Sequence, residues 1–291
     1  MEYLKHLPKK VRIVEVGPRD GLQNEKAFVS TEKKIRLIES LADTGLAVIE
    51  ATAFVHPKWV PQMADSKEVL LGTKLKKGVL YPVLVPNVKG LERALEAGVQ
   101  EIAVFTAASE TFSEKNTNCS IAESLKRIEE VGAKAKKAGL WIRGYVSTCF
   151  VCPYEGKIAP EASEKVIQAL FQLGVSEVSI GDTIGAATPL QVEVLLSLLQ
   201  KKGMDFSKLA MHFHDTYGMA LANVLLSLEW GVSIFDSSIG GLGGCPYAPG
   251  ASGNLATEKL LYFLDGLGIE TGVDLEKINA LSKSLKADLF S

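Results

Sequence analysis

The chain has 291 residues, of which 47% are hydrophobic, and a formal net charge of −2 at pH 7. This length fits either two ordinary domains or one large α/β barrel of about 250 residues, and the apolar content is ample for a sizeable core. The near-neutral charge gives no electrostatic case for nucleic-acid binding, and no apolar run approaches the ~20 residues that a membrane span needs.

The N-terminal stretch and the cysteines indicate the cellular compartment. Met1–His6 has neither the apolar core of a signal peptide nor the arginine-rich composition of a transit peptide. The four cysteines are scattered over a long chain, which does not suggest a disulfide framework. We therefore expect a protein of the reducing cytoplasm.

One pattern repeats along the chain: a β-rich run, then a helix, then a glycine. In the first unit, Ser30 is the expected N-cap of a helix with Ile35, Ile38 and Leu41 at core-facing spacing, and Gly45 ends it. Glycine separates each later helix from the next β-rich run, as is usual where a helix ends in the left-handed conformation. The expected strands are 11–16, 47–51, 79–85, 101–106, 141–148, 177–182, 209–214 and 233–238, and the last helix of the pattern lies near 255–264.

Eight strand–helix units predict a (β/α)₈ TIM barrel, because strict alternation gives parallel strands joined by crossovers. A doubly wound open sheet is the main alternative. No linker-like Pro/Ser-rich stretch interrupts the pattern, so we expect residues 1–291 to form a single TIM-barrel catalytic domain with short extra C-terminal helices over 266–291. Pro82, inside the third strand, is expected at a strand end or a bulge.

Polar residues gather at the carboxyl ends of the expected strands, where a TIM barrel places its active site. They come from distant parts of the sequence, yet the barrel would bring them to one mouth. The residues at these ends are Arg19, Asp20, Glu50, Asp182, His212 and His214.

His212 and His214 lie two apart on a strand and point to the same side, which suits either two metal ligands or one ligand beside one acid–base group. With Asp20 they form an oxygen and nitrogen ligand set that favours Mg²⁺ or Mn²⁺, and Asn254 is a candidate for a further ligand through its amide oxygen. Arg19 offers a fixed positive charge for a carboxylate, a carbonyl or an enolate. The competing interpretation of Arg19 and Asp20 is an exposed ion pair in a turn.

Glu50 and Asp182 each fit a metal ligand, a partner of Arg19, or a charge buried in the barrel, and we favour the partner role. The glycine-rich run 240–244 has neither the G-x-G-x-x-G spacing nor a P-loop lysine, so we interpret it as a mobile loop that closes over substrate and brings Cys245 into the site. Cys149 and Cys152 form a C-x-x-C pair without the second pair that zinc requires, so no metal or redox use is favoured for them.

Several stretches resemble the 3-hydroxy-3-methylglutaryl-CoA lyase family, in its bacterial type. The loop around Cys245 is the specific part, since related barrel enzymes share the Arg-Asp and His-x-His features without it. Ala53 stands where some members have serine, a small change in the expected substrate pocket. The resembling stretches are 16–25, 49–52, 144–147, 152–156, 181–185, 212–218 and 241–258, spread over nearly the whole chain.

The resemblance implies a metal-dependent carbon–carbon lyase that cleaves 3-hydroxy-3-methylglutaryl-CoA, an acyl-CoA thioester, into acetoacetate and acetyl-CoA, in leucine catabolism or ketone-body formation. It implies a Mg²⁺ or Mn²⁺ ion held at the positions of Asp20, His212, His214 and Asn254. Arg19 matches the substrate- and enolate-stabilising arginine, and Cys245 matches a loop cysteine required for activity. The supporting acids of the family match Glu50, Asp182 and Glu258.

In this mechanism His212 is our choice for the proton carrier, and Cys245 is a candidate for protonating the enolate carbon; Asp20 and Arg19 complete the catalytic set. Two other functions stay open. One is a Claisen-type condensing enzyme of the same barrel superfamily, and the other is a non-catalytic metal-binding barrel. We expect no nucleic-acid or membrane partner, and leave a homodimer open.

Overall fold

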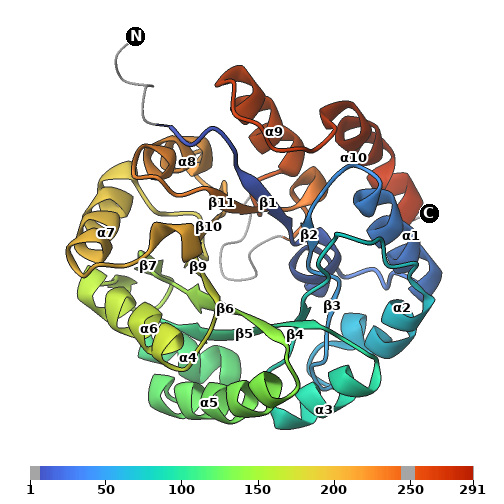
Figure 1. Ribbon diagram of the computed structural model, residues 1–291, viewed down its shortest axis with the longest axis horizontal. Coiled ribbons are helices and arrows are strands. Elements are labelled where there is room, and N and C mark those ends of the chain that lie inside the picture. The colour runs from blue at the N-terminus through green and yellow to red at the C-terminus, as the bar shows by residue number, and fades with distance from the viewer. Residues whose placement is uncertain (1–6, 244–252, 291) are drawn as a thin grey trace.

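The computed structural model describes residues 7–243 and 253–290, and Figure 1 shows a ring of strands enclosed by a ring of helices. The strands of the large sheet pair in parallel, in the order β2-β1-β11-β10-β9-β6-β5-β4-β3. They are β1 (Arg12–Glu15), β2 (Val48–Ile49), β3 (Thr52–Ala53), β4 (Val83–Leu84), β5 (Glu101–Ala107), β6 (Trp141–Ser147), β9 (Glu177–Asp182), β10 (Leu209–Phe213) and β11 (Ile234–Ser237).

The barrel closes through a second strand that is split into β2 and β3. β2 pairs with β1, and β3 pairs with β4. Between the two halves, the Glu50 N–H donates to the Glu15 carbonyl on one side, and the Ala51 N–H donates to the Pro82 carbonyl on the other. The segment therefore spans the gap as one barrel strand, and the eight-stranded TIM barrel that the sequence predicts is confirmed.

Helices lie between successive barrel strands and cover the outside of the barrel (Figure 1). Ser30 caps the first of them as predicted, since its side chain accepts a hydrogen bond from the Lys33 N–H. Ile38 and Leu41, which belong to the predicted apolar face of this helix, are buried in the core. The helices are α1 (Thr31–Ala42), α2 (Ser66–Gly72), α3 (Val88–Glu96), α4 (Glu110–Thr117), α5 (Ile121–Lys137), α6 (Pro160–Gln172), α7 (Pro189–Lys201), α8 (Ala220–Glu229), α9 (Thr257–Gly266) and α10 (Leu275–Phe290).

Shorter elements join this frame at both mouths of the barrel. A small antiparallel hairpin, β7 (Val151–Cys152) and β8 (Gly156–Lys157), follows β6. Single turns of helix lie at Pro61–Met63, Phe206–Lys208 and Ile239–Gly241. None of the helices within residues 7–243 and 253–290 combines the length and the apolar character needed to cross a membrane.

Three expected elements differ in extent from the sequence analysis. The expected strand 79–85 shrinks to β4 and a single bridge at Leu80, because Pro82 has no N–H to donate to a neighbouring strand. The loop expected after the first strand contains a π-helix, η1 (Gly17–Gly21). Beyond α9 the structure has one extra helix, α10, within the one or two that the sequence predicts, but it is 16 residues long rather than short.

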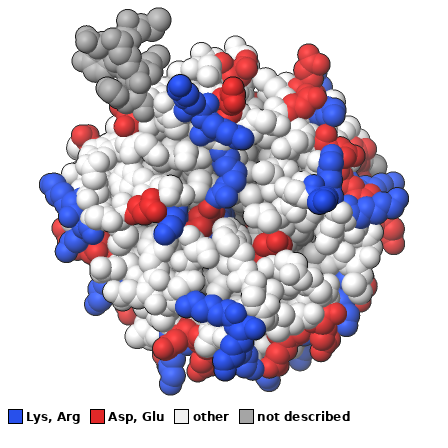
Figure 2. Space-filling model, viewed as in Figure 1, with Lys and Arg blue, Asp and Glu red and all other residues white. Residues whose placement is uncertain are grey.

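The surface in Figure 2 shows lysine and arginine side chains interspersed with aspartate and glutamate around the rim of the molecule. This mixture agrees with the formal net charge of −2. Buried charged residues, such as Arg19 and Glu50, lie instead inside the barrel.

Candidate active site

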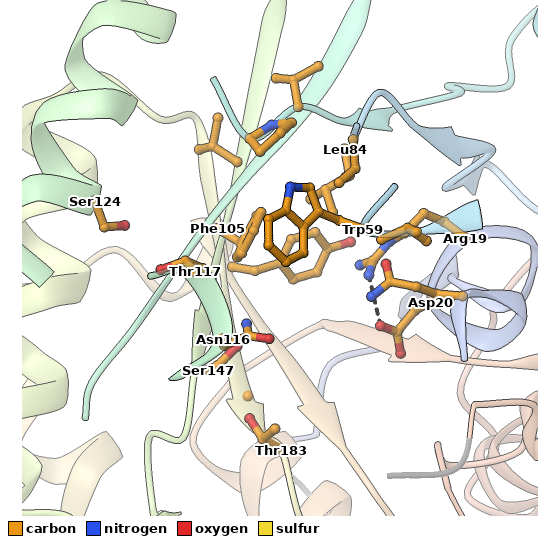
Figure 3. Close-up of a pocket in the computed structure, with 18 of the residues that line it drawn as sticks. Arg19, Asp20, Trp59, Leu84, Phe105, Asn116, Thr117, Ser124, Ser147 and Thr183 are labelled. Atoms are coloured by element: carbon orange, nitrogen blue, oxygen red, sulfur yellow. Dashed lines mark hydrogen bonds and ion pairs between the residues drawn. The ribbon is translucent and has the colours of Figure 1, made fainter. Parts of the chain in front are cut away.

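A cavity of about 830 Å³ opens at the carboxyl ends of the barrel strands. It is lined by residues at the carboxyl ends of β1, β3, β4, β5, β6, β9 and β10 or in the segments that follow these strands, and Figure 3 shows Arg19, Asp20, Ser147 and Thr183 among them. Polar residues in its lining include Arg19, Asp20, Tyr145, Ser147, Thr183, His212 and His214.

The π-helix η1 aims Arg19 and Asp20 into this cavity. The Val16 carbonyl accepts hydrogen bonds from three successive N–H groups, those of Arg19, Asp20 and Gly21, at 3.2, 2.8 and 3.1 Å. Gly17 permits so tight a turn, because a Cβ there would lie 2.6 Å from Oε1 of Glu15. The two functional side chains thus project from a turn fixed by backbone hydrogen bonds.

Asp20, His212 and His214 form a cluster whose ligand atoms all lie within 4.8 Å of one another. Asn254 joins them: its Nδ2 donates to Oδ2 of Asp20 at 2.8 Å and to the Leu242 carbonyl at 2.9 Å. A backbone bridge between His214 and Asn254 fixes this neighbourhood. Residues from three distant parts of the sequence are therefore gathered closely enough to hold one small cation.

The protonation states of Asp20 and His214 also suit a divalent cation. Burial raises the pKa of Asp20, but Arg19 and the two histidines outweigh it and lower that pKa to about 2. Burial and the neighbouring His212 lower the pKa of His214 to about 4. Nδ1 of His214 is buried with no hydrogen-bond partner among the described residues. An ionised carboxylate and a neutral imidazole with an unused nitrogen are the forms that bind such a metal.

Arg19 lies between two carboxylates. Its Nη1 lies 2.8 Å from Oδ1 of Asp20 and its Nη2 lies 2.7 Å from Oε2 of the fully buried Glu50. The guanidinium also stacks over the Tyr145 ring, 5.3 Å from the centroid. Burial opposes its charge, but Glu50 and Asp20 hold the pKa of Arg19 above its ordinary value. Arg19 is a permanent, immobilised positive charge that faces the cavity.

Asp236 on β11 was missed in the sequence analysis, although it contacts the cluster directly. Its Oδ2 lies 3.2 Å from Nδ1 of His212, and its Oδ1 lies 2.6 Å from Nη2 of Arg143. Burial lowers the pKa of His212, but the hydrogen bond and charge of Asp236 raise it overall. Because Nδ1 faces Asp236, the other ring nitrogen of His212 is left for the cluster.

A buried ion chain runs from Asp236 down the barrel interior. Arg143 is fully buried, and its Nε lies 2.8 Å from Oε1 of Glu177, which also contacts Arg12 near the opposite mouth. Ser179 donates to Oδ2 of Asp236 at 2.8 Å. The sequence does contain a signal for this ion chain, namely a charged residue in each of the expected strands 141–148, 177–182 and 233–238, but such charges are unusual in a barrel core.

Two of the predicted supporting acids lie beside the cluster rather than in it. Asp182 accepts hydrogen bonds from the N–H groups of Ala186 and Ala187 at 3.0 and 3.1 Å, and burial raises its pKa to about 6. Glu258 accepts from the Gly240 N–H at 3.1 Å and from the Ser282 hydroxyl at 2.7 Å, at the base of the glycine-rich loop. Both carboxylates organise loops around the cavity.

The cysteines divide into two groups. Cys245 lies outside the described residues, so its predicted place in the site stays a prediction. Cys149 and Cys152 are buried free thiols. Burial raises the pKa of Cys149 to about 12, so this thiol stays protonated and unreactive at neutral pH.

Residues 10–285 match the model of the HMGL-like family. The cytoplasmic 3-hydroxy-3-methylglutaryl-CoA lyase of Danio rerio is 58% identical over 275 residues, which cover 94% of this chain and 82% of that protein. The name of this relative includes the word cytoplasmic, whereas the lyase of Macaca fascicularis, which is 57% identical to this chain, is named as mitochondrial.

Among solved structures, the hydroxymethylglutaryl-CoA lyase of Pseudomonas aeruginosa matches with a TM-score of 0.95 and 51% identity, covering 98% of this chain and 95% of that one. An HMG-CoA lyase of Acinetobacter baumannii, in complex with coenzyme A and 3-methylmalate, matches with a TM-score of 0.91 and 39% identity over 96% of this chain and 91% of its own.

The fold and the site define a TIM-barrel enzyme with its polar cluster at the carboxyl ends of the strands, and its class is a carbon–carbon lyase. The chain belongs to the hydroxymethylglutaryl-CoA lyase family.

Proposed function

We propose that this protein cleaves 3-hydroxy-3-methylglutaryl-CoA to acetoacetate and acetyl-CoA with the help of a divalent metal ion. The observation that carries the proposal is the convergence of Asp20, His212 and His214 beside the immobilised Arg19 in one cavity. The named activity of the matched relatives supports the choice of substrate, and the coenzyme A in the Acinetobacter baumannii structure supports a CoA thioester.

Asp20, His212 and His214 would hold the ion, with Asn254 as the fourth ligand. The ion, when bound, supplies Lewis-acid activation of an oxygen on the substrate. Because the donors are one carboxylate and imidazoles without thiolates, Mg²⁺ or Mn²⁺ fits the set. Asn254 contacts Asp20 through its amide nitrogen, and a half-turn of this amide would direct its oxygen to the ion.

The protein side chains would perform the remaining steps. Through the ring nitrogen that does not face Asp236, and only while that nitrogen is not bound to the ion, His212 would take the proton from the tertiary hydroxyl. The C2–C3 bond breaks, and the hydroxyl carbon becomes the ketone of acetoacetate. The bonding electrons pass to the thioester, where Arg19 stabilises the charge on the enolate oxygen. A proton then reaches the enolate carbon and gives acetyl-CoA, with Cys245 as the proposed donor.

The structure explains why Arg19 suits this task. Its partners Glu50 and Asp20 fix the guanidinium before substrate arrives, so little reorganisation accompanies the development of charge. Glu50 serves as the positioning partner of Arg19, and Asp182 and Glu258 hold the loops around the cavity.

The direct test is an assay of acetoacetate release from 3-hydroxy-3-methylglutaryl-CoA before and after treatment with a chelator. We expect activity to be lost on chelation and restored by Mg²⁺ or Mn²⁺, because the ion is the group that would activate the substrate hydroxyl in the proposed reaction. Full activity in metal-stripped enzyme would overturn the metal assignment. Parallel reactions with acetyl-CoA and 2-oxo acids test the Claisen-type alternative, and absence of turnover in both assays favours a non-catalytic barrel.

The domain organisation, cellular location, pathway and oligomeric state of the protein can each be tested separately. We propose a single catalytic domain across the chain, a cytoplasmic location and a role in leucine degradation, which the name of the Danio rerio relative supports only as to compartment. A single cooperative unfolding transition, cell fractionation and growth on leucine after gene deletion test these three in turn. Sedimentation measures whether the protein forms a homodimer.

A further inference from the structure

The helical turn that follows β11 is in contact with α10, the last helix of the chain. This turn, η4 (Ile239–Gly241), leads directly into Leu242 and Gly243, which both lie against the side chain of Asn254. Figure 1 shows α10 on the outside of the barrel between α1 and α9, and α9 and α10 both contact η4. A path of contacts therefore connects α10 with the cluster in the barrel mouth.

Glu258, in the first turn of α9, carries the polar part of this path. Its Oε2 accepts a hydrogen bond from the Gly240 N–H at 3.1 Å, and its Oε1 accepts one from the Ser282 hydroxyl of α10 at 2.7 Å. The terminal torsion of a glutamate has a broad range of favourable values, so one hydrogen bond alone does not fix the direction of its carboxylate. The second bond, from Ser282, therefore orients Glu258 toward the turn.

Gly240 packs so closely against α10 that the turn has little room to shift. It has a φ of 63°, and a Cβ at this position would lie 2.7 Å from Cδ2 of the buried Leu285, one helical turn beyond Ser282. On the other side of the turn, the buried carboxylate of Glu15 accepts from the Ile239 N–H at 2.9 Å. The backbone of η4 is thus held from the barrel interior and from α10 at once.

The position of η4 in turn determines how Asn254 is held. The Leu242 N–H donates to the Ile239 carbonyl at 3.2 Å, which ties Leu242 to the turn. The Leu242 carbonyl accepts from Nδ2 of Asn254 at 2.9 Å, and the same nitrogen donates to Oδ2 of Asp20 at 2.8 Å. A displacement of the turn would move this carbonyl, and with it the amide that contacts Asp20.

We propose that Ser282 is a positioning residue for the cluster: through Glu258 it fixes η4, and through the Leu242 carbonyl it fixes the amide of Asn254 beside Asp20. This inference rests on the proposed function only where it assigns Asn254 and Asp20 to the metal ion. Ser282 lies outside the cavity lining, so it acts through Glu258 and not on the substrate. In this role α10 supports the site as well as covering the barrel.

The first test measures how firmly the turn is held, without metal or substrate. Ser282→Ala is compared with Ser284→Ala, the matched control, because the Ser284 hydroxyl bonds the Leu281 carbonyl within α10 and not α9. Hydrogen exchange of metal-free protein, followed by mass spectrometry, reports on a peptide that contains residues 238–243. We expect exchange about two- to tenfold faster in Ser282→Ala, the range for loss of one hydrogen bond, and unchanged in Ser284→Ala.

The second test measures the affinity for Mn²⁺ by electron paramagnetic resonance of the free ion. We expect a loss of about two- to tenfold in Ser282→Ala, and parent values in Ser284→Ala and in Ser282→Thr, which keeps the hydroxyl. Thermal unfolding verifies that each variant is folded. If Ser282→Ala does not fold, Ser282→Cys, with a weaker donor, provides the same comparison.

The outcomes separate this inference from the proposed function. Unchanged exchange in Ser282→Ala, or equally faster exchange in Ser284→Ala, overturns the role of Ser282 in holding the turn. Faster exchange with an unchanged affinity for Mn²⁺ overturns the connection to the cluster. A parent protein that binds no Mn²⁺ contradicts the metal dependence in the proposed function, and the exchange rates then still decide whether Ser282 holds η4.

Discussion

At the scale of single residues, Arg19 shows how a buried charge is made ready for reaction. Two carboxylates and the face of Tyr145 surround the guanidinium, so its position does not depend on substrate. Interactions that strengthen only as charge develops in the transition state appear in kcat rather than in substrate affinity. This separation can be measured.

Arg19→Gln keeps hydrogen-bonding capacity and removes the charge. We expect kcat to fall about 10²–10³-fold, the usual effect of losing one oxyanion donor, while the affinity for Mn²⁺ is retained. Steady-state kinetics and metal titration measure the two effects. Arg93→Gln, at an arginine on α3 that stacks over Phe54 outside the cavity lining, is the control. A raised KM with kcat nearly unchanged would show that Arg19 only anchors the ground state.

Asp236 is the residue whose role the structure adds to the site. Because its carboxylate holds Nδ1 of His212, we expect Asp236→Asn to lower the affinity for Mn²⁺ about 10- to 100-fold, as loss of such a supporting carboxylate typically does. Electron paramagnetic resonance of free Mn²⁺ gives the affinity. Ser179→Ala removes another hydrogen bond to the same carboxylate and should change the affinity far less. Equal effects of the two variants would contradict the orienting role.

The sequence predicted the residues of the cluster and Glu50 as the partner of Arg19, but not Asp236 and Arg143. Asp20 follows the first expected strand and His212 and His214 lie at the end of the seventh, so the barrel rule alone brings them together. Asp236 and Arg143 lie inside strands, where alternation gives the face but not the depth of a side chain, and their pairing depends on barrel closure. No local pattern encodes that closure.

At the scale of elements, the predicted strand–helix alternation was correct, and the errors fall where local backbone chemistry departs from it. β4 is short because of Pro82, and the second strand is interrupted at Glu50, whose side chain serves Arg19. The π-helix η1 depends on three N–H groups that share one carbonyl, an arrangement that hydrophobic periodicity does not report.

In the loop after β11, Gly243 lies against the side chain of Asn254. Gly243 has a φ of 101°, and a Cβ there would lie 2.6 Å from Nδ2 of Asn254. We expect Gly243→Ala to displace Asn254 from Asp20 and to lower lyase activity at least tenfold. Gly139→Ala is the matched control, since Gly139 also has a positive φ, 73°, but nothing lies within 4 Å of its Cβ position. Comparable losses of activity in both variants would show backbone strain rather than displacement.

At the scale of the whole molecule, Glu15 joins three parts of the barrel that are distant in sequence. Its fully buried carboxylate accepts from the Gly17 N–H at 2.8 Å, the Ile239 N–H at 2.9 Å and the Thr257 hydroxyl at 2.6 Å. Burial outweighs these bonds and raises the pKa of Glu15 from its ordinary value of 4.5 to about 7. The folded protein therefore holds this proton more tightly than the unfolded chain does.

This difference predicts a pH dependence of stability. Glu15 contributes its full stabilisation below pH 4.5 and loses it as the pH rises to about 7, because the unfolded chain releases the proton first. Over this window the free energy of unfolding of the parent protein should fall by about 3 kcal/mol more than that of Glu15→Gln, whose side chain at this position cannot titrate. Urea unfolding of both proteins at pH 5 and pH 8 measures it. A constant difference between them would show that Glu15 stays charged throughout.

The hydrogen bond between Asn254 and Asp20 joins residues 234 positions apart, and β1 pairs with β11, the last strand of the barrel. At a synthesis rate of about 5–20 residues per second, Asp20 leaves the ribosome tens of seconds before its partner exists. During that interval one edge of the first strand has no neighbour, and the carboxylate stands apart from both histidines. The cluster of Asp20, His212, His214 and Asn254 thus forms only after β10 and the segment around Asn254 have been made, so a chain that ends before β10 would have most of the barrel strands and no such cluster.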